Sequence, residues 1–182
     1  PWDAYRYAKG GAIILPDANG DQTIEARIGR PLDFTAVTDH AEFFGQINVC
    51  TLDDSKLGYW WPHCMMTRAS NIWLQLLAAN WWTDLGGQLE DPPSKSFACS
   101  VSDCDKGDRE TWQQTQQAAE DHYDRSEECG FTTFVAYEYT EAFDQNNMHR
   151  NVIFRNTEVP AMPVSVYDLS LIHISEPTRL RR

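Results

Sequence analysis

The chain has 182 residues, with 27 acidic and 15 basic side chains and a formal net charge of −12 at pH 7. This charge argues against nucleic acid or an anionic membrane surface as a partner, because Lys and Arg drive binding to phosphates. No apolar run approaches the length of a membrane span, and seven Trp, seven Tyr and eight Phe supply a core for one domain.

The N-terminal part predicts a helix and then a hairpin. Residues 2–9 suggest a short helix, which two glycines at 10–11 end. Segments 12–15 and 23–28 have the composition of strands, and the Asn-Gly pair at 19–20 between them is typical of a hairpin turn.

Residues 31–40, PLDFTAVTDH, read as a buried strand that ends in Asp39 and His40. A buried strand delivers the residues that follow it to the carboxyl edge of a sheet, where open α/β sheets and barrels place their chemistry. A carboxylate and an imidazole side by side are good ligands for a divalent metal. Such a pair on its own is more often a cap or a surface pair, so its meaning depends on later segments.

The middle of the chain predicts two helices separated by loops. Residues 45–63 read as irregular, and residues 65–85 as a helix. A polar loop follows, and Asp108 is expected to cap a helix over residues 109–127, which returns the chain to a parallel strand. The tryptophans of the first helix are expected to pack against the body: Trp73, Trp81 and Trp82.

Two later strands also carry candidate metal ligands. Residues 131–140, FTTFVAYEYT, present Glu138 near their end, and residues 149–155 begin with His149 after a turn at 146–147. Three strands thus place a possible ligand at or near a terminus, which favours a shared site over three unrelated surface residues.

The segments PLDFTAVTDHAEFFG, FTTFVAYEYT and MHRNVIFR, in this order, resemble signatures of a PHP-like family (named after polymerase and histidinol phosphatase) catalogued as a domain of unknown function. The resemblance extends from about residue 3 to 168. It implies an α/β fold, a piece of a distorted (β/α) barrel that holds two or three Zn, Mn or Fe ions. It also implies Asp39 and His40 as the second motif of the family. Glu138 would be the third-motif carboxylate, and His149 the histidine that follows it.

The resemblance implies a metal-dependent hydrolase, first of all a phosphoesterase, that uses a metal-activated water on a small anionic substrate. Asp39 would be a ligand or would orient one, and Glu138 would bridge two ions. Arg150 would clamp a substrate oxygen, unless it forms an ordinary surface ion pair. Glu42 is expected to pair with Arg150 or with the arginines of the hairpin, Arg27 and Arg30.

The resemblance further implies an incomplete domain over residues 1–168, with a long helical and loop insertion between the second-motif and third-motif strands. The His-x-His strand and the final Asp-x-His pair of the family have no counterpart here. Residues 169–182 resemble a translated sequencing adapter, so His173 is left out of the site. The piece alone is therefore expected to bind metal poorly and to have little activity.

The cysteines have no paired C-x-x-C spacing, which argues against a structural zinc site. Cys50 with Cys64, and Cys99 with Cys104, bracket loops that disulfides could close in an oxidising compartment, whereas Cys129 could pair with any of them or stay free. Reduced, partly buried thiols remain the alternative. Disulfides would favour a periplasmic or extracellular location.

The other histidines are weaker candidates: His122 lies in a predicted helix and reads as structural, and His63 lies on a loop near the site. Two alternatives to the phosphoesterase remain open. One is a non-enzymatic extracytoplasmic binding module held by disulfides, in which the strand-end residues are caps. The other is an amidohydrolase-like enzyme that cleaves C–N or carboxyl-ester bonds with the same metals.

Overall fold

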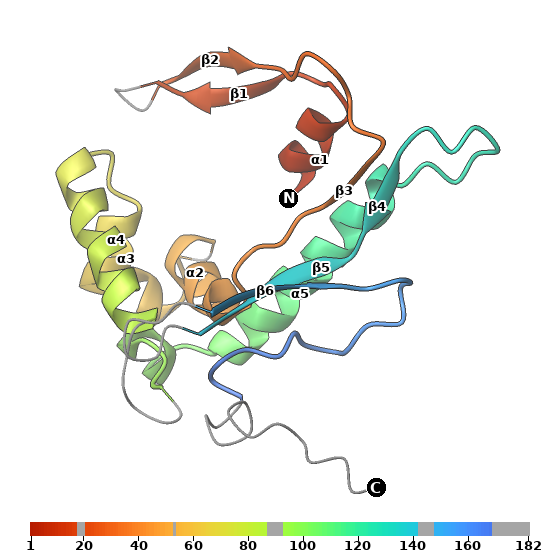
Figure 1. Ribbon diagram of the computed structural model, residues 1–182. Coiled ribbons are helices and arrows are strands. Elements are labelled where there is room, and N and C mark those ends of the chain that lie inside the picture. Colours follow the sequence, from red (N-terminus) through yellow and green to blue (C-terminus); the bar gives the residue numbers. More distant parts are fainter. Residues whose placement is uncertain (18–20, 53, 87–92, 142–147, 169–182) are drawn as a thin grey trace, which may run out of the picture.

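A computed structural model describes residues 1–17, 21–52, 54–86, 93–141 and 148–168. One helix and three strands come first, the other helices follow together, and three strands come after them; the strands form separate two-stranded sheets (Figure 1). The α-helices are α1 (Trp2–Ala8), α2 (Phe44–Thr51), α3 (Pro62–Thr67), α4 (Ile72–Gly86) and α5 (Cys104–His122); the 3₁₀ helices are η1 (Ala41–Phe43), η2 (Leu57–Trp60) and η3 (Phe97–Ser100). The strands are β1 (Ile13–Pro16), β2 (Gln22–Ala26), β3 (Phe34–Ala36), β4 (Thr132–Phe134), β5 (Ala136–Glu141) and β6 (Met148–Ile153).

The N-terminal elements agree with the sequence. Helix α1 covers most of the predicted segment, and Gly10 follows it with a φ of +81°, a left-handed conformation that favours glycine. Strands β1 and β2 pair antiparallel as the predicted hairpin, with Ile13 opposite Ala26. The predicted turn at 19–20 lies outside the described residues.

The parallel crossover is also confirmed. Strand β3 pairs in parallel with β4, with Phe34 opposite Thr132, and α5 precedes β4 as the returning helix. The predicted strand over 31–40 is shorter than expected, because ladder pairing stops at Ala36 and resumes at a single parallel bridge between His40 and Glu138. The predicted strand over 131–140 is divided in the same way into β4 and β5.

The prediction of an irregular segment over residues 45–63 is wrong, because α2 lies there. This helix packs directly on α5, and Gly45 lies at the closest approach: a Cβ there would lie 2.0 Å from the backbone oxygen of Cys104. The glycine that weakens the helical signal in the sequence is therefore what lets the two helix backbones meet.

The predicted start of α5 is wrong by about a turn. Its cap is Asp103, whose side chain accepts a hydrogen bond from the backbone N–H of Lys106 at 2.8 Å. Asp108 lies inside the helix instead, where it accepts from the Gly45 N–H at 2.5 Å and pairs with Lys95 at 3.0 Å. Asp108 thus joins α5 to α2 and to the preceding loop.

The predicted single helix over 65–85 is divided into α3 and α4. Asn71 begins α4: its side-chain oxygen accepts from the N–H groups of Trp73 at 2.9 Å and Leu74 at 3.4 Å. A cap in this position starts a new helix instead of continuing the old one. The expected packing is wrong for Trp73, which is 73% exposed.

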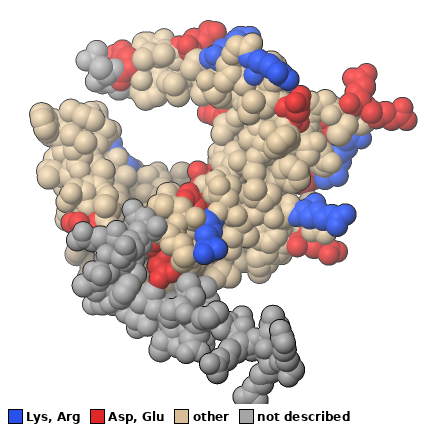
Figure 2. Space-filling model, viewed as in Figure 1, with Lys and Arg blue, Asp and Glu red and all other residues tan. Residues whose placement is uncertain are grey.

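Helix α4 presents an apolar, nearly uncharged surface. In Figure 2 its side of the molecule is almost free of blue and red, and it stands apart from the β1–β2 hairpin. Several of its large apolar side chains are exposed: Ile72, Trp73, Leu74, Leu76 and Leu77. No described helix has the combination of length and apolarity that crossing a membrane requires.

The main core lies between α5 and β5, with Trp112 at its centre. Trp112 is fully buried, its ring meets that of Tyr137 edge to face at 5.8 Å, and its Nε1–H donates to the backbone oxygen of Pro160 at 2.8 Å. This packing fixes one face of β5 and leaves the other for a site.

The described residues form a mixed α and β structure in which no barrel is closed. The proposed incomplete barrel over residues 1–168 stays a prediction, and residues 169–182 lie outside the described part.

Candidate metal site

Strand pairing gathers the candidate ligands on one face of β5. Strands β5 and β6 are antiparallel, with Thr140 opposite His149, and His40 bridges to Glu138 from the other edge of β5. Because side chains alternate along a strand, Glu138 and Thr140 lie on the face opposite Tyr137 and Tyr139, which belong to the core. The cluster therefore lies over the outer face of the β5–β6 sheet.

Glu138 lies between two imidazoles. Its Oε1 is 2.7 Å from Nδ1 of His149, and its Oε2 is 3.6 Å from Nε2 of His40. One ligand atom from each of the three residues lies within 4.8 Å of the others. The His40 and His149 side chains are 43% and 47% exposed and Glu138 is 17% exposed, so a small molecule can reach the cluster.

Two residues that the sequence did not single out as part of the site complete its contacts. The Thr140 hydroxyl lies 2.8 Å from Nδ1 of His40 and 3.1 Å from Nδ1 of His149. Glu42 Oε1 lies 2.9 Å from Nδ1 of His40. Neither had a distinctive signal: Glu42 is one carboxylate in an acidic chain, and Thr140 looks like an ordinary strand residue.

Glu42 is a buried carboxyl group, only 3% exposed, and its Oε2 has no hydrogen-bond partner among the described residues. Burial raises the pKa of Glu42, and hydrogen bonding from its own backbone and the nearby His40 opposes that shift. The expected pairing of Glu42 with an arginine is wrong, because its ion pair is with His40 and Arg27 lies next to Glu25 at 3.9 Å.

The structure does not bring Asp39 or Arg150 into this cluster. Asp39 contributes its backbone oxygen, which accepts from the Glu138 N–H at 2.9 Å, and together with His40 it lines a hollow of about 380 Å³ between α2 and α5. Arg150 is exposed and lies opposite Tyr139 in the register of β5 and β6. Its side chain therefore projects from the face of β6 that is opposite to His149. The three residues brought together are His40, Glu138 and His149.

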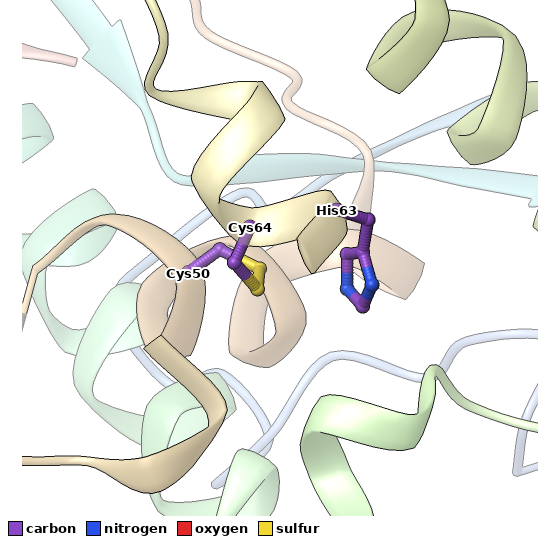
Figure 3. A group of neighbouring side chains, drawn as sticks. All are labelled: Cys50, His63 and Cys64. Carbon is purple, nitrogen blue, oxygen red and sulfur yellow. A yellow bond between two sulfur atoms is a disulfide. The ribbon is translucent and has the colours of Figure 1, made fainter. Parts of the chain in front are cut away.

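A second group of possible ligands consists of Cys50, His63 and Cys64, all buried (Figure 3). Its two sulfur atoms are joined in a disulfide, so neither is a free thiolate. His63 is a core residue: it is 4% exposed and stacks on Trp81 at 3.8 Å between ring centroids. The predicted loop position of His63 is wrong, because it lies in the first turn of α3.

Burial of His63 should make the free energy of unfolding depend on pH. Burial lowers the pKa of His63 to about 4, whereas an unfolded histidine titrates near ~6.5. As the pH falls below the pKa of this histidine in the unfolded state, the unfolded state binds a proton that the folded state does not bind, so the free energy of unfolding decreases. Between pH 7 and 5 this loss should be about 2 kcal/mol.

We expect His63→Phe, which keeps an aromatic ring against Trp81, to remove this part of the pH dependence. Urea unfolding of both proteins at pH 7 and pH 5 measures it. Equal losses in the two proteins would contradict the role of His63, because other titrating groups are common to both.

Two disulfides are present, Cys50–Cys64 and Cys99–Cys104, and Cys129 is free and exposed. They join the pairs expected from the sequence and are compatible with an oxidising, extracytoplasmic environment.

The model of a protein family of unknown function, DUF3604, matches residues 1–180. The chain belongs to this family. The assignment to a PHP-like family from the sequence is corrected by this match, so the site roles inferred from that resemblance now rest on the geometry alone. No curated protein and no solved structure matches the chain.

Proposed function

We propose that this DUF3604 chain supplies His40, Glu138 and His149 to the metal centre of a hydrolase. The observation that carries the proposal is the accessible cluster of two imidazoles and one carboxylate, with one ligand atom of each within 4.8 Å. Nitrogen and carboxylate donors together suit Zn²⁺, Mn²⁺ or Fe²⁺. A two- or three-ion centre would need further ligands beside these.

A bound divalent ion would polarise a substrate oxygen and lower the pKa of water from 15.7 toward about 7. The chain's own contribution is positioning. Glu138 directs one oxygen toward each imidazole, and the neutral forms of His40 and His149 supply lone pairs. Three protein ligands would leave coordination positions of such an ion open for substrate.

The proposed substrate is a small anionic ester, first of all a phosphoester. An ion held at this cluster would concentrate positive charge on a chain whose net charge is −12, and that local field attracts anions that the rest of the surface repels. The two disulfides support a periplasmic or extracellular location for this activity.

The test is hydrolysis of p-nitrophenyl phosphate, bis-p-nitrophenyl phosphate and p-nitrophenyl acetate by the protein with a large excess of Zn²⁺, Mn²⁺ or Fe²⁺. We expect a slow, metal-dependent release from a phosphoester that His40→Ala removes and that His122→Ala retains. His122 is the matched control, because its ring stacks on Tyr5 and lies outside the cluster.

If p-nitrophenyl acetate alone is hydrolysed in a metal-dependent reaction, the result would contradict the phosphoesterase and favour a carboxyl-ester hydrolase at the same site. Turnover that survives His40→Ala, or the lack of any metal-dependent turnover, would contradict the proposed centre and favour a binding module.

A further inference from the structure

The His40 ring is held at one edge by two side chains. Its Nδ1 lies 2.9 Å from Glu42 Oε1 and 2.8 Å from the Thr140 hydroxyl, whereas its Nε2 faces Glu138 Oε2 at 3.6 Å. An imidazole that donates from Nδ1 has its free lone pair on Nε2. The contacts at one edge thus select the nitrogen that faces the cluster.

Glu42 is well placed to orient the His40 ring because its backbone is held in a buried part of the structure. It lies in η1, between His40 and α2, and its backbone oxygen accepts from the side-chain amide of Gln46 at 2.9 Å. Gln46 is itself only 1% exposed, and its side-chain amide also donates a hydrogen bond to the Tyr167 hydroxyl at 3.1 Å. This buried network fixes the backbone of Glu42 where η1 meets α2, and the side-chain contact of Glu42 is the one from Oε1 to His40.

Burial also strengthens the Glu42–His40 contact. Glu42 is 3% exposed, and a hydrogen bond to a carboxylate that is shielded from water is stronger than one at the surface. Among the described residues the ion pair of Glu42 is with His40. A buried carboxylate next to a partly exposed imidazole is arranged to orient that imidazole, since burial of a charge has to be compensated by its partner.

We propose that Glu42 is a positioning residue: it holds the Nδ1–H of His40, with Thr140 as a second contact, so that Nε2 is presented to Glu138 as a metal ligand. This inference rests on the proposed metal centre. It adds that the centre depends on a side chain that binds no substrate and no ion.

The test is a long-range ¹H–¹⁵N spectrum of metal-free, histidine-labelled protein at pH 8, with titration by Co²⁺ as a second measurement. We expect the His40 proton on Nδ1 in the wild type and in Glu42→Gln, whose amide oxygen still accepts. In Glu42→Ala we expect a mixture of tautomers and a Co²⁺ affinity lower by about 10–100-fold.

Glu141→Ala is the matched control, because Glu141 is also buried but lies on the other face of β5, with Tyr137 and Tyr139. It should leave the His40 tautomer unchanged. An unchanged tautomer and affinity in Glu42→Ala would overturn the positioning role. A wild type that shows the Nδ1–H tautomer yet binds no Co²⁺ would contradict the proposed metal centre while leaving the hydrogen-bond assignment intact.

Discussion

Replacing Glu138 by alanine should lower the affinity of the protein for Zn²⁺ or Mn²⁺ by more than about 100-fold, beyond the 10–100-fold typical of losing a residue that only supports a ligand. The reason is geometric: Glu138 faces both imidazoles, at 2.7 Å from His149 and 3.6 Å from His40. Its loss leaves two neutral rings with no charged group between them. Isothermal titration calorimetry with the purified wild type and variant measures the effect.

The matched control for this prediction is Glu158→Ala, which removes an exposed carboxylate outside the cluster. It separates loss of a ligand from a change of one unit in net charge. If Glu138→Ala and Glu158→Ala bind metal equally well, then the cluster is not the site that holds the ion. Circular dichroism of both variants checks that the fold is retained.

Much of this site could be foreseen from the sequence because strand ends carry a strong local pattern. His40, Glu138 and His149 each follow or open an apolar, β-branched run, and the structure brings all three together. Sequence also led to the parallel pairing of β3 and β4, because a helix between two strands favours a crossover.

Asp39 shows what the residue pattern does not determine. At the bridge to Glu138, Asp39 contributes its backbone oxygen, whereas His40 contributes its ring to the cluster. Arg150, one residue after His149, lies on the other face of β6 from His149. A pattern of residue types identifies a neighbourhood, whereas the register of the strands decides which side chains meet.

Glu42 and Thr140 could not be recognised at all, because their role depends on burial and on contacts across the chain. Thr140 touches His40 from 100 residues away in sequence. Helix α2 was missed for a related reason: its glycine weakens the helical pattern, and packing against Cys104 at the start of α5 is what favours Gly45 there. Long-range packing overrides local propensity at these positions.

The free energy of unfolding of the protein should depend strongly on the core behind the outer-face site, and Trp112→Ala tests this. Trp112 is fully buried and contacts Tyr137, the neighbour of Glu138 in β5. Truncating a buried Trp costs about 3–5 kcal/mol, and here it also leaves the Pro160 carbonyl without its donor. We expect a loss of this size in the free energy of unfolding, measured by urea denaturation.

Trp73→Ala is the control for the loss of an indole ring, because Trp73 is 73% exposed on α4 and its removal should change the stability by less than about 0.5 kcal/mol. Trp112→Phe keeps a ring against Tyr137 but not the hydrogen bond, so its cost should fall between the two. Equal stability of the Trp112→Ala and Trp73→Ala proteins would show that the α5–β5 layer is not the core that supports Glu138. Because Trp112 packs on one face of β5 and the ligands project from the other, Trp112→Phe should retain metal affinity while it loses stability.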